Sequence, residues 1–83
     1  MGKYKVDIIT QTDLIDFVTL ATQLGEDTVV RVLNEDNSFI CNGKSLLGVR
    51  HAMEWDAIYI DAYNKKTLDN ADIYTKFKRF IVE

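Results

Sequence analysis

The spacing of apolar residues changes along the chain between the two-residue period of a strand and the longer period of a helix. Residues 4–10 alternate between apolar and polar side chains, which predicts a strand. From Thr12 to Leu24 the apolar residues recur every three or four positions. This spacing predicts a helix that Thr12 or Asp13 caps and that Gly25 ends. The first two elements are therefore a strand and a helix.

The middle of the chain predicts two strands and a short helix. Residues 27–41 read as two strands joined by a tight turn at residues 35–37, because β-branched residues flank a stretch rich in Asn and Asp. An Asn-Gly turn signal at residues 42–43 then precedes the segment KSLLGVRHAM, residues 44–53. This segment is too short for a long helix, but its apolar spacing predicts a brief one that Ser45 caps.

A strand with two different faces follows in residues 54–63, EWDAIYIDAY, where apolar and other side chains alternate regularly. Successive side chains of a strand point to opposite sides of the sheet, so the alternation predicts which residues share a face. One face carries Ile58, Ile60 and Ala62, and the other carries Trp55, Ala57, Tyr59 and Tyr63.

A last helix is predicted over residues 68–81, with Thr67 as its cap and with Asp69 and Asp72 near its amino end. The order of elements is then β-α-β-β-α-β-α, in a single domain that spans residues 1–83. We predict an α+β fold, an open-faced two-layer sandwich in which a four-stranded antiparallel sheet carries three helices on one face.

Composition and charge narrow the classes of function. A net charge of −3 and a pI near 5.0 argue against nucleic-acid binding, which depends on a basic face. No apolar run reaches the roughly 20 residues of a membrane span. The single cysteine, Cys41, has no partner for an internal disulfide or a zinc site. We predict a cytoplasmic protein with no metal, no cofactor, and neither a nucleic acid nor a membrane as its partner.

The residues that could react chemically show no pattern that is typical of a catalytic site. His51 has no second titratable group at a fixed spacing that would activate it. Nothing near Cys41 in the sequence would make its thiol a nucleophile. The sequence also shows no Gly-rich phosphate loop and no pair of catalytic carboxylates at a recognisable spacing. We predict that the protein is not an enzyme.

The order of elements and the segment GKSLLGV, residues 43–49, resemble HPr, the histidine-containing phosphocarrier protein of the sugar phosphotransferase system, and its catabolite-repression paralogue. In that family a serine opens the short second helix in a pattern like Lys-Ser-Ile-Met-Gly-Val, which residues 44–49 match. The resemblance implies an HPr-like fold and regulatory phosphorylation at Ser45. It also implies a protein partner, a phosphotransferase-system kinase or a LacI-type transcriptional regulator.

The chain departs from this family where the phosphoryl group would be carried. The family's acceptor histidine stands at the start of the first helix, together with an arginine and a proline. Here residues 10–16 read TQTDLID, which contains none of the three. Asp13 and Asp16 also add negative charge where a phosphate needs positive charge. We therefore predict a degenerate family member that has lost phosphocarrier activity and acts as a regulatory or adaptor protein.

Ser45 has two predicted roles, which do not compete. As a helix cap, its hydroxyl accepts a backbone N–H bond that contributes about 1 kcal/mol. A phosphate on the same oxygen would add a charge of roughly −2 at the amino end of a helix, where the N–H groups and the helix dipole favour it. The residues predicted to contact a partner are Leu46, Leu47, Val49, Arg50, Trp55, Tyr59 and Tyr63.

The uncovered face of the sheet suggests an alternative function. If Ile58 and Ile60 face the helices, the aromatic residues of the same strand lie on the uncovered face. A large apolar surface of this kind usually marks an interface. The alternative is therefore a small protein-binding or oligomerisation module, such as a homodimer, unrelated to sugar transport. A register shift of one residue would exchange the two faces. The residues expected on this surface are Trp55, Tyr59, Tyr63, Val29, Leu33 and Ile9.

Overall fold

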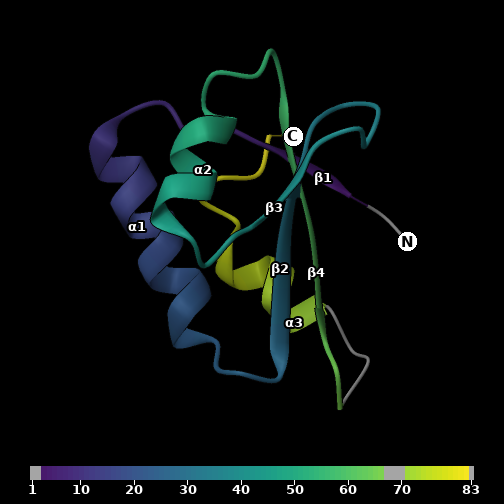
Figure 1. Cartoon of the computed structure of the whole chain (residues 1–83). Coiled ribbons are helices and arrows are strands. Elements are labelled where there is room, and N and C mark those ends of the chain that lie inside the picture. The colour runs from purple at the N-terminus through teal and green to yellow at the C-terminus, as the bar shows by residue number, and fades with distance from the viewer. Residues whose placement is uncertain (1–2, 67–70, 83) are drawn as a thin grey trace.

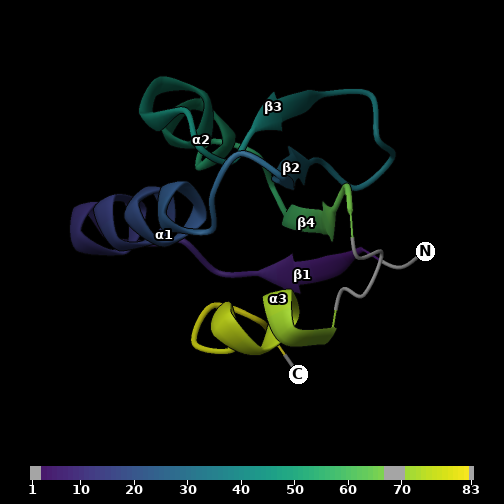
Figure 2. The same cartoon turned by 90° about the horizontal axis from the view of Figure 1, so that it is seen from below.

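A four-stranded antiparallel sheet and three helices make up the part of the chain that the structure describes (Figures 1 and 2). The structure is a computed structural model, and it describes residues 3–66 and 71–82. The elements are β1 (Tyr4–Val6), α1 (Gln11–Gln23), β2 (Thr28–Leu33), β3 (Ile40–Asn42), α2 (Leu46–Ala52), β4 (Ile58–Asn64) and α3 (Ala71–Lys76). The predicted α+β class and antiparallel sheet are confirmed, and the arrangement is compatible with a two-layer sandwich.

The strands lie in the order β1-β4-β2-β3, so the pairing of β2 with β4 forms the centre of the sheet. Val30 lies opposite Ala62, and Val32 lies opposite Ile60. All four side chains are buried against the helices, which confirms the predicted inner face of the last strand. The residues between them point to the opposite face, because side chains alternate along a strand. None of the described helices covers that face, which we call the open face (Figure 2).

Aromatic rings join the carboxyl-terminal segment to the first helix. The Phe17 ring of α1 is fully buried. Its centroid lies 5.0 Å from that of Phe77 and 5.4 Å from that of Phe80, which follow α3 in the chain. Ring pairs in this range contribute about 0.5–1.5 kcal/mol beyond the burial of their area. These contacts hold the residues that follow α3 against α1.

The first helix begins earlier than predicted. Its cap is Thr10 rather than Thr12 or Asp13: the Thr10 hydroxyl accepts the Asp13 N–H at 3.0 Å. The Asp13 carboxylate in turn accepts the N–H groups of Ile9 at 3.2 Å and Thr10 at 3.1 Å. These reciprocal bonds fix residues 9 and 10 as part of a helix cap. The predicted strand over residues 4–10 therefore ends at Val6.

The last helix ends at Lys76, before the predicted end at residue 81. The predicted cap Thr67 and the residues up to 70 lie outside the described part of the chain. After the helix the chain pairs with the outer edge of β1, so it cannot continue as a helix. Backbone bonds run from the Asp7 N–H to the Phe80 carbonyl at 2.9 Å and from the Val82 N–H to the Lys5 carbonyl at 2.8 Å.

Gly43 allows the turn after β3 to lie directly on β2. Its N–H donates to the Val30 carbonyl at 2.7 Å. A Cβ at position 43 would lie 2.5 Å from Val30 Cγ1 and 3.1 Å from the Val30 carbonyl oxygen. Because a side chain does not fit there, the close approach requires glycine. This turn leads into α2, so the contact helps to position the start of that helix.

We expect Gly43→Ala to lower the free energy of unfolding by about 1–3 kcal/mol, because the added carbon overpacks against Val30. Chemical denaturation measures the change. Gly48→Ala is the matched control: it adds the same atom inside α2, where the Cβ would lie 3.2 Å from Cys41 Cβ and alanine favours the helix by about 0.5–1 kcal/mol. A loss at position 48 as large as the loss at position 43 would contradict this account.

Candidate functional site

Ser45 stands at the start of α2, where its side chain caps the helix. Its backbone is extended, with φ −97° and ψ 116°, and its Oγ accepts the Gly48 N–H at 3.1 Å. The Ser45 N–H donates to the Asn42 carbonyl at 3.0 Å, so the preceding turn fixes the serine in place. The predicted cap is confirmed. Ser45 remains partly exposed, and the bond that its hydroxyl accepts is half-buried.

Two leucines form an exposed apolar pair in the first turn of α2. Leu46 is 50% exposed and Leu47 is 82% exposed. Arg50 is also exposed, and it lies three and four positions after the leucines, on the same side of the helix. We call Ser45, Leu46, Leu47 and Arg50 the α2 surface. It combines a hydroxyl, apolar area and one positive charge.

Val49 does not belong to the α2 surface, although it was among the residues predicted to contact a partner. It is 0% exposed, as is Ala52. These two residues are three positions apart and form the buried side of the helix, which packs into the core. A partner cannot reach Val49 while α2 stays packed on the sheet.

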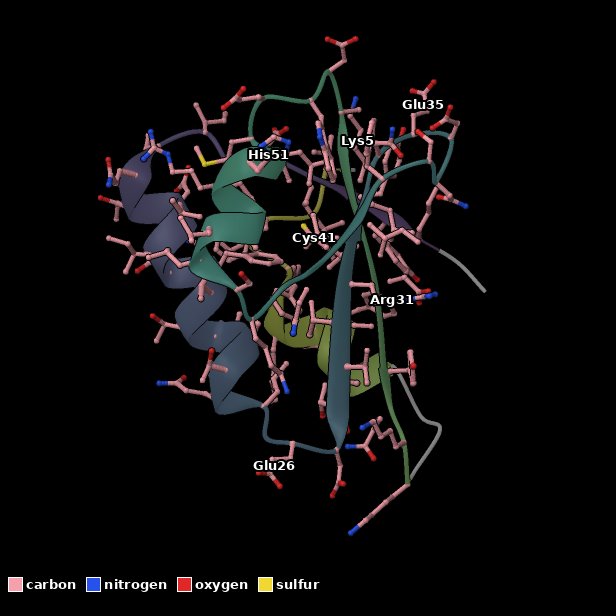
Figure 3. All side chains as sticks on the ribbon, viewed as in Figure 1. Lys5, Glu26, Arg31, Glu35, Cys41 and His51 are labelled. Carbon is pink, nitrogen blue, oxygen red and sulfur yellow. The ribbon has the colours of Figure 1, made fainter. Side chains whose placement is uncertain are left out.

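Cys41 and His51 have different surroundings (Figure 3). The Cys41 thiol lies between β3 and α2 and donates to the Gly48 carbonyl, with the sulfur 3.3 Å from the oxygen. Burial raises the pKa of this thiol, so it stays protonated at neutral pH and is a poor nucleophile. Its contact attaches α2 to the edge of the sheet. His51 is exposed in the last turn of α2.

The start of α1, where the resemblance implies a phosphoryl acceptor, carries a cluster of ion pairs. Arg79 lies 2.7 Å from the Asp13 carboxylate and 3.6 Å from the Asp16 carboxylate. Hydrogen bonds from the backbone N–H groups of Thr10 and Ile9 hold the pKa of Asp13 below its ordinary value of 3.8. An ionised carboxylate therefore accepts the hydrogen bonds of N–H groups that could otherwise donate to a phosphate.

The open face carries Tyr59 and Tyr63 in the predicted register. Tyr63 lies opposite Val29, and Tyr59 lies opposite Leu33. Both tyrosines are half-buried, and Leu33 is only 4% exposed. The apolar area that a partner could cover is therefore smaller than predicted.

Charged side chains also divide the open face. Arg31 and Asp61 form an ion pair across β2 and β4, at a position between the two tyrosines (Figure 3 shows Arg31). The Lys3 ammonium lies 4.6 Å from the centroid of the Tyr59 ring. Covering these charges with a partner would remove water from them at a cost in free energy. The open face is therefore less suited to self-association than its tyrosines alone suggest.

Trp55 and Ile9 do not lie on the open face, where they were predicted. Ile9 is 73% exposed beside the cap of α1. Trp55 lies in the turn between α2 and β4, and its ring stacks on that of Phe39 with centroids 6.2 Å apart. Because β4 begins only at Ile58, residues before it do not follow the alternation of the strand. The sequence pattern did not single out Phe39, which comes from the turn between β2 and β3.

We expect Ser45→Ala to lower the free energy of unfolding by about 1 kcal/mol, because the Gly48 N–H loses its acceptor. Ser45→Asp keeps a capping oxygen and should unfold with a free energy close to that of the natural chain. Denaturant titration of the three proteins measures the difference. An alanine variant as stable as the natural chain would mean that the hydroxyl does not support the helix.

Ionisation of Asp13 should make the free energy of unfolding depend on pH in the acid range. Its carboxyl binds a proton at lower pH in the folded protein than in the unfolded chain, so it stabilises the fold above its ordinary pKa of 3.8. This contribution is lost as the pH falls through the lowered pKa. We expect Asp13→Asn to be less stable than the natural chain at neutral pH, with the gap closing under acid conditions. Unfolding of both proteins measured across this pH range gives the test. Parallel curves of unfolding free energy against pH for the two proteins would contradict the role of the Asp13 carboxylate.

The predicted site residues thus lie in different places. Four of them form the α2 surface, Val49 is in the core, and Trp55 is in a turn. The two tyrosines are on the open face.

Within residues 3–66 and 71–82, no group of three or more His, Cys, Asp or Glu side chains could hold a metal ion. In the same residues, no helix has the length and apolar character needed to cross a membrane. Comparison with known proteins finds no family model, curated protein or solved structure that matches the chain.

Proposed function

We propose that this chain is an HPr-like regulatory or adaptor protein of the cytoplasm. It has lost phosphocarrier activity, is not an enzyme, and acts by binding a protein partner under the control of phosphorylation at Ser45. The observation that carries this proposal is the α2 surface, in which a partly exposed serine stands beside two exposed leucines. The order of elements, which agrees with the order that the resemblance implies, also supports it.

A phosphate on Ser45 is compatible with the local structure of α2. The modification adds about −1.5 to −2 units of charge and three strong acceptor oxygens. Both are favourable at the amino end of a helix, where N–H groups and the positive end of the dipole face outward. Ser45 Oγ already lies 3.1 Å from the Gly48 nitrogen. The phosphate would therefore change the charge of the surface without requiring the helix to unfold.

The exposed leucines supply the contact energy that the phosphate alone lacks. Full burial of a leucine side chain contributes about 1.5–3 kcal/mol, and Leu47 is 82% exposed in the free protein. A partner that covers Leu46 and Leu47 would bring a basic side chain within reach of the phosphate, and bonds between a guanidinium and a phosphate are strong and directional. The phosphate then controls binding of the partner, because its bond adds to the binding free energy that the leucine contact already supplies.

The geometry at the start of α1 supports the loss of phosphocarrier activity. No histidine stands in residues 10–16, and the Asp13 carboxylate binds the N–H groups of the cap. Arg79, the positive side chain at this end of the helix, is paired with Asp13 and Asp16. A phosphate here would have to displace a carboxylate and would meet a second one close by.

Phosphorylation tests the proposal directly. We expect incubation with HPr kinase/phosphorylase and ATP to add one phosphate to the natural chain, measured as intact mass. Ser45→Ala should gain none. Ser38→Ala is the matched control, because Ser38 is the other serine of the chain and lies exposed in a turn. An unmodified natural chain, or equal modification of the Ser45→Ala variant, would refute phosphorylation at Ser45.

Binding to a LacI-type repressor is the second part of this test. We expect the phosphorylated chain to bind about tenfold more tightly than the unmodified one, which corresponds to about 1.4 kcal/mol and to one added charge-assisted hydrogen bond. Leu47→Asp should weaken binding of the phosphorylated chain. Ile9→Asp, a similar change at an exposed residue outside α2, should not. Equal effects of both substitutions would place the contact elsewhere.

A further inference from the structure

A hollow lies between two turns that are distant in the sequence. The turn between β2 and β3 forms one wall, and the turn between α2 and β4 forms the other. Its volume is about 450 Å³, within the range of roughly 300–1,000 Å³ that is usual for ligand pockets. No residue of the α2 surface lines it. The hollow is therefore a second surface, separate from Ser45 and its neighbours.

Phe39 and Trp55 form the aromatic part of the hollow. Their ring centroids are 6.2 Å apart and their planes meet at 25°. Phe39 is 60% exposed and Trp55 is partly exposed, so neither ring is enclosed by the protein. The face of an aromatic ring carries negative charge density and attracts cations. An exposed pair of rings is thus a surface on which a flat cationic group can stack.

The wall that carries Phe39 is held by its own hydrogen bonds. The Phe39 N–H donates to Asn34 Oδ1 at 3.0 Å. The Asn34 amide donates to the Ser38 hydroxyl at 2.9 Å, and that hydroxyl donates to Asp36 at 2.7 Å. Because these bonds are made within residues 34–39, they hold the turn in one conformation. A preformed site loses less conformational entropy on binding.

The charge of the lining decides which occupant fits. None of the described residues that line the hollow is Lys, Arg or His. The Lys3 ammonium bonds to the same turn, at Asn37 Oδ1 and at the carbonyls of two lining residues, Asn34 and Glu35. It lies over the Tyr59 ring, and Lys3 itself is not among the lining residues. A strongly acidic lining complements a cation and repels an anion. The four carboxylates of the lining are those of Glu35, Asp36, Glu54 and Asp56.

We propose that this hollow, the aromatic–acidic pocket, binds an arginine side chain from a basic peptide segment of a protein partner. The guanidinium group is flat, so it can stack on Phe39 and Trp55 while its edge donates hydrogen bonds to a carboxylate of the lining. A lysine ammonium lacks the flat face and the fixed fork of donors. The inference does not depend on phosphorylation of Ser45, since the two surfaces share no residue.

The fluorescence of Trp55 reports binding at this pocket, because Trp55 is the only tryptophan in the chain. The probe is the peptide acetyl-Gly-Arg-Gly-Arg-Gly-amide, titrated into the natural protein while Trp55 fluorescence is recorded. The control peptide carries citrulline in place of arginine, which keeps the shape of the side chain and removes its charge. We expect a saturable change with the arginine peptide and none with the citrulline peptide. Binding should weaken as salt is added, since salt screens exposed charges.

Two pairs of variants locate the site. Glu35→Gln should weaken binding about two- to fivefold, in line with an exposed ion pair. Glu26→Gln makes the same chemical change at the other end of the molecule and should have no effect (Figure 3). Phe39→Leu keeps an apolar side chain but removes the ring, so it should also weaken binding about two- to fivefold. Ile15→Ala, at an exposed apolar residue of α1, is its control.

Three outcomes would overturn the proposal. No saturable change with the arginine peptide would mean that the pocket does not bind it. Equal binding of the two peptides would show that positive charge is not recognised. Equal losses in Glu35→Gln and Glu26→Gln would show a general attraction to an acidic protein rather than a site. Circular dichroism of each variant confirms that the fold is retained, as expected for substitutions at exposed positions.

Discussion

The pairing of β2 with β4 is the constraint on which the rest of the structure depends. Its register sets Leu33 opposite Tyr59 and buries one face of both strands under the helices. A shift of one residue would expose Val32 and bury Arg31, at a large cost in free energy. The same register brings the turn after β2 beside the turn before β4. The aromatic–acidic pocket therefore follows directly from the alignment of the two central strands.

The position of α2 depends on two close contacts with the sheet. Gly43 lies directly on Val30, and the Cys41 thiol bonds to the Gly48 carbonyl. Val49 anchors the inner side of the helix in the core. These contacts fix the first turn of α2, so its exposed leucines are held in a fixed position. A partner that binds there does not have to order the helix first, and more of the contact energy remains available for binding.

Local features of the fold were predictable from the sequence, whereas contacts between distant residues were not. Ser45 was identified as a cap and Gly25, with φ +90°, as a helix end, because these roles depend on a few adjacent residues. The pairing of Arg79 with Asp13 joins residues 66 positions apart, and no periodic pattern records it. Trp55 was assigned to the wrong surface for a related reason: alternation alone does not show where a strand begins. The α2 surface was therefore largely predictable, and the aromatic–acidic pocket was not.

The two surfaces lie at opposite ends of α2 in the sequence. Ser45 precedes the helix, and Glu54 and Trp55 follow it. Seven helical residues span about 10 Å, which exceeds the screening length of about 8 Å at physiological ionic strength. A phosphate at Ser45 would therefore change the electrostatic field in the pocket only weakly, and both surfaces could be occupied at once. Under the proposed adaptor function, this arrangement would allow the chain to join two partners or to bind two segments of one partner. In the second case the linked segments would bind at a raised effective concentration.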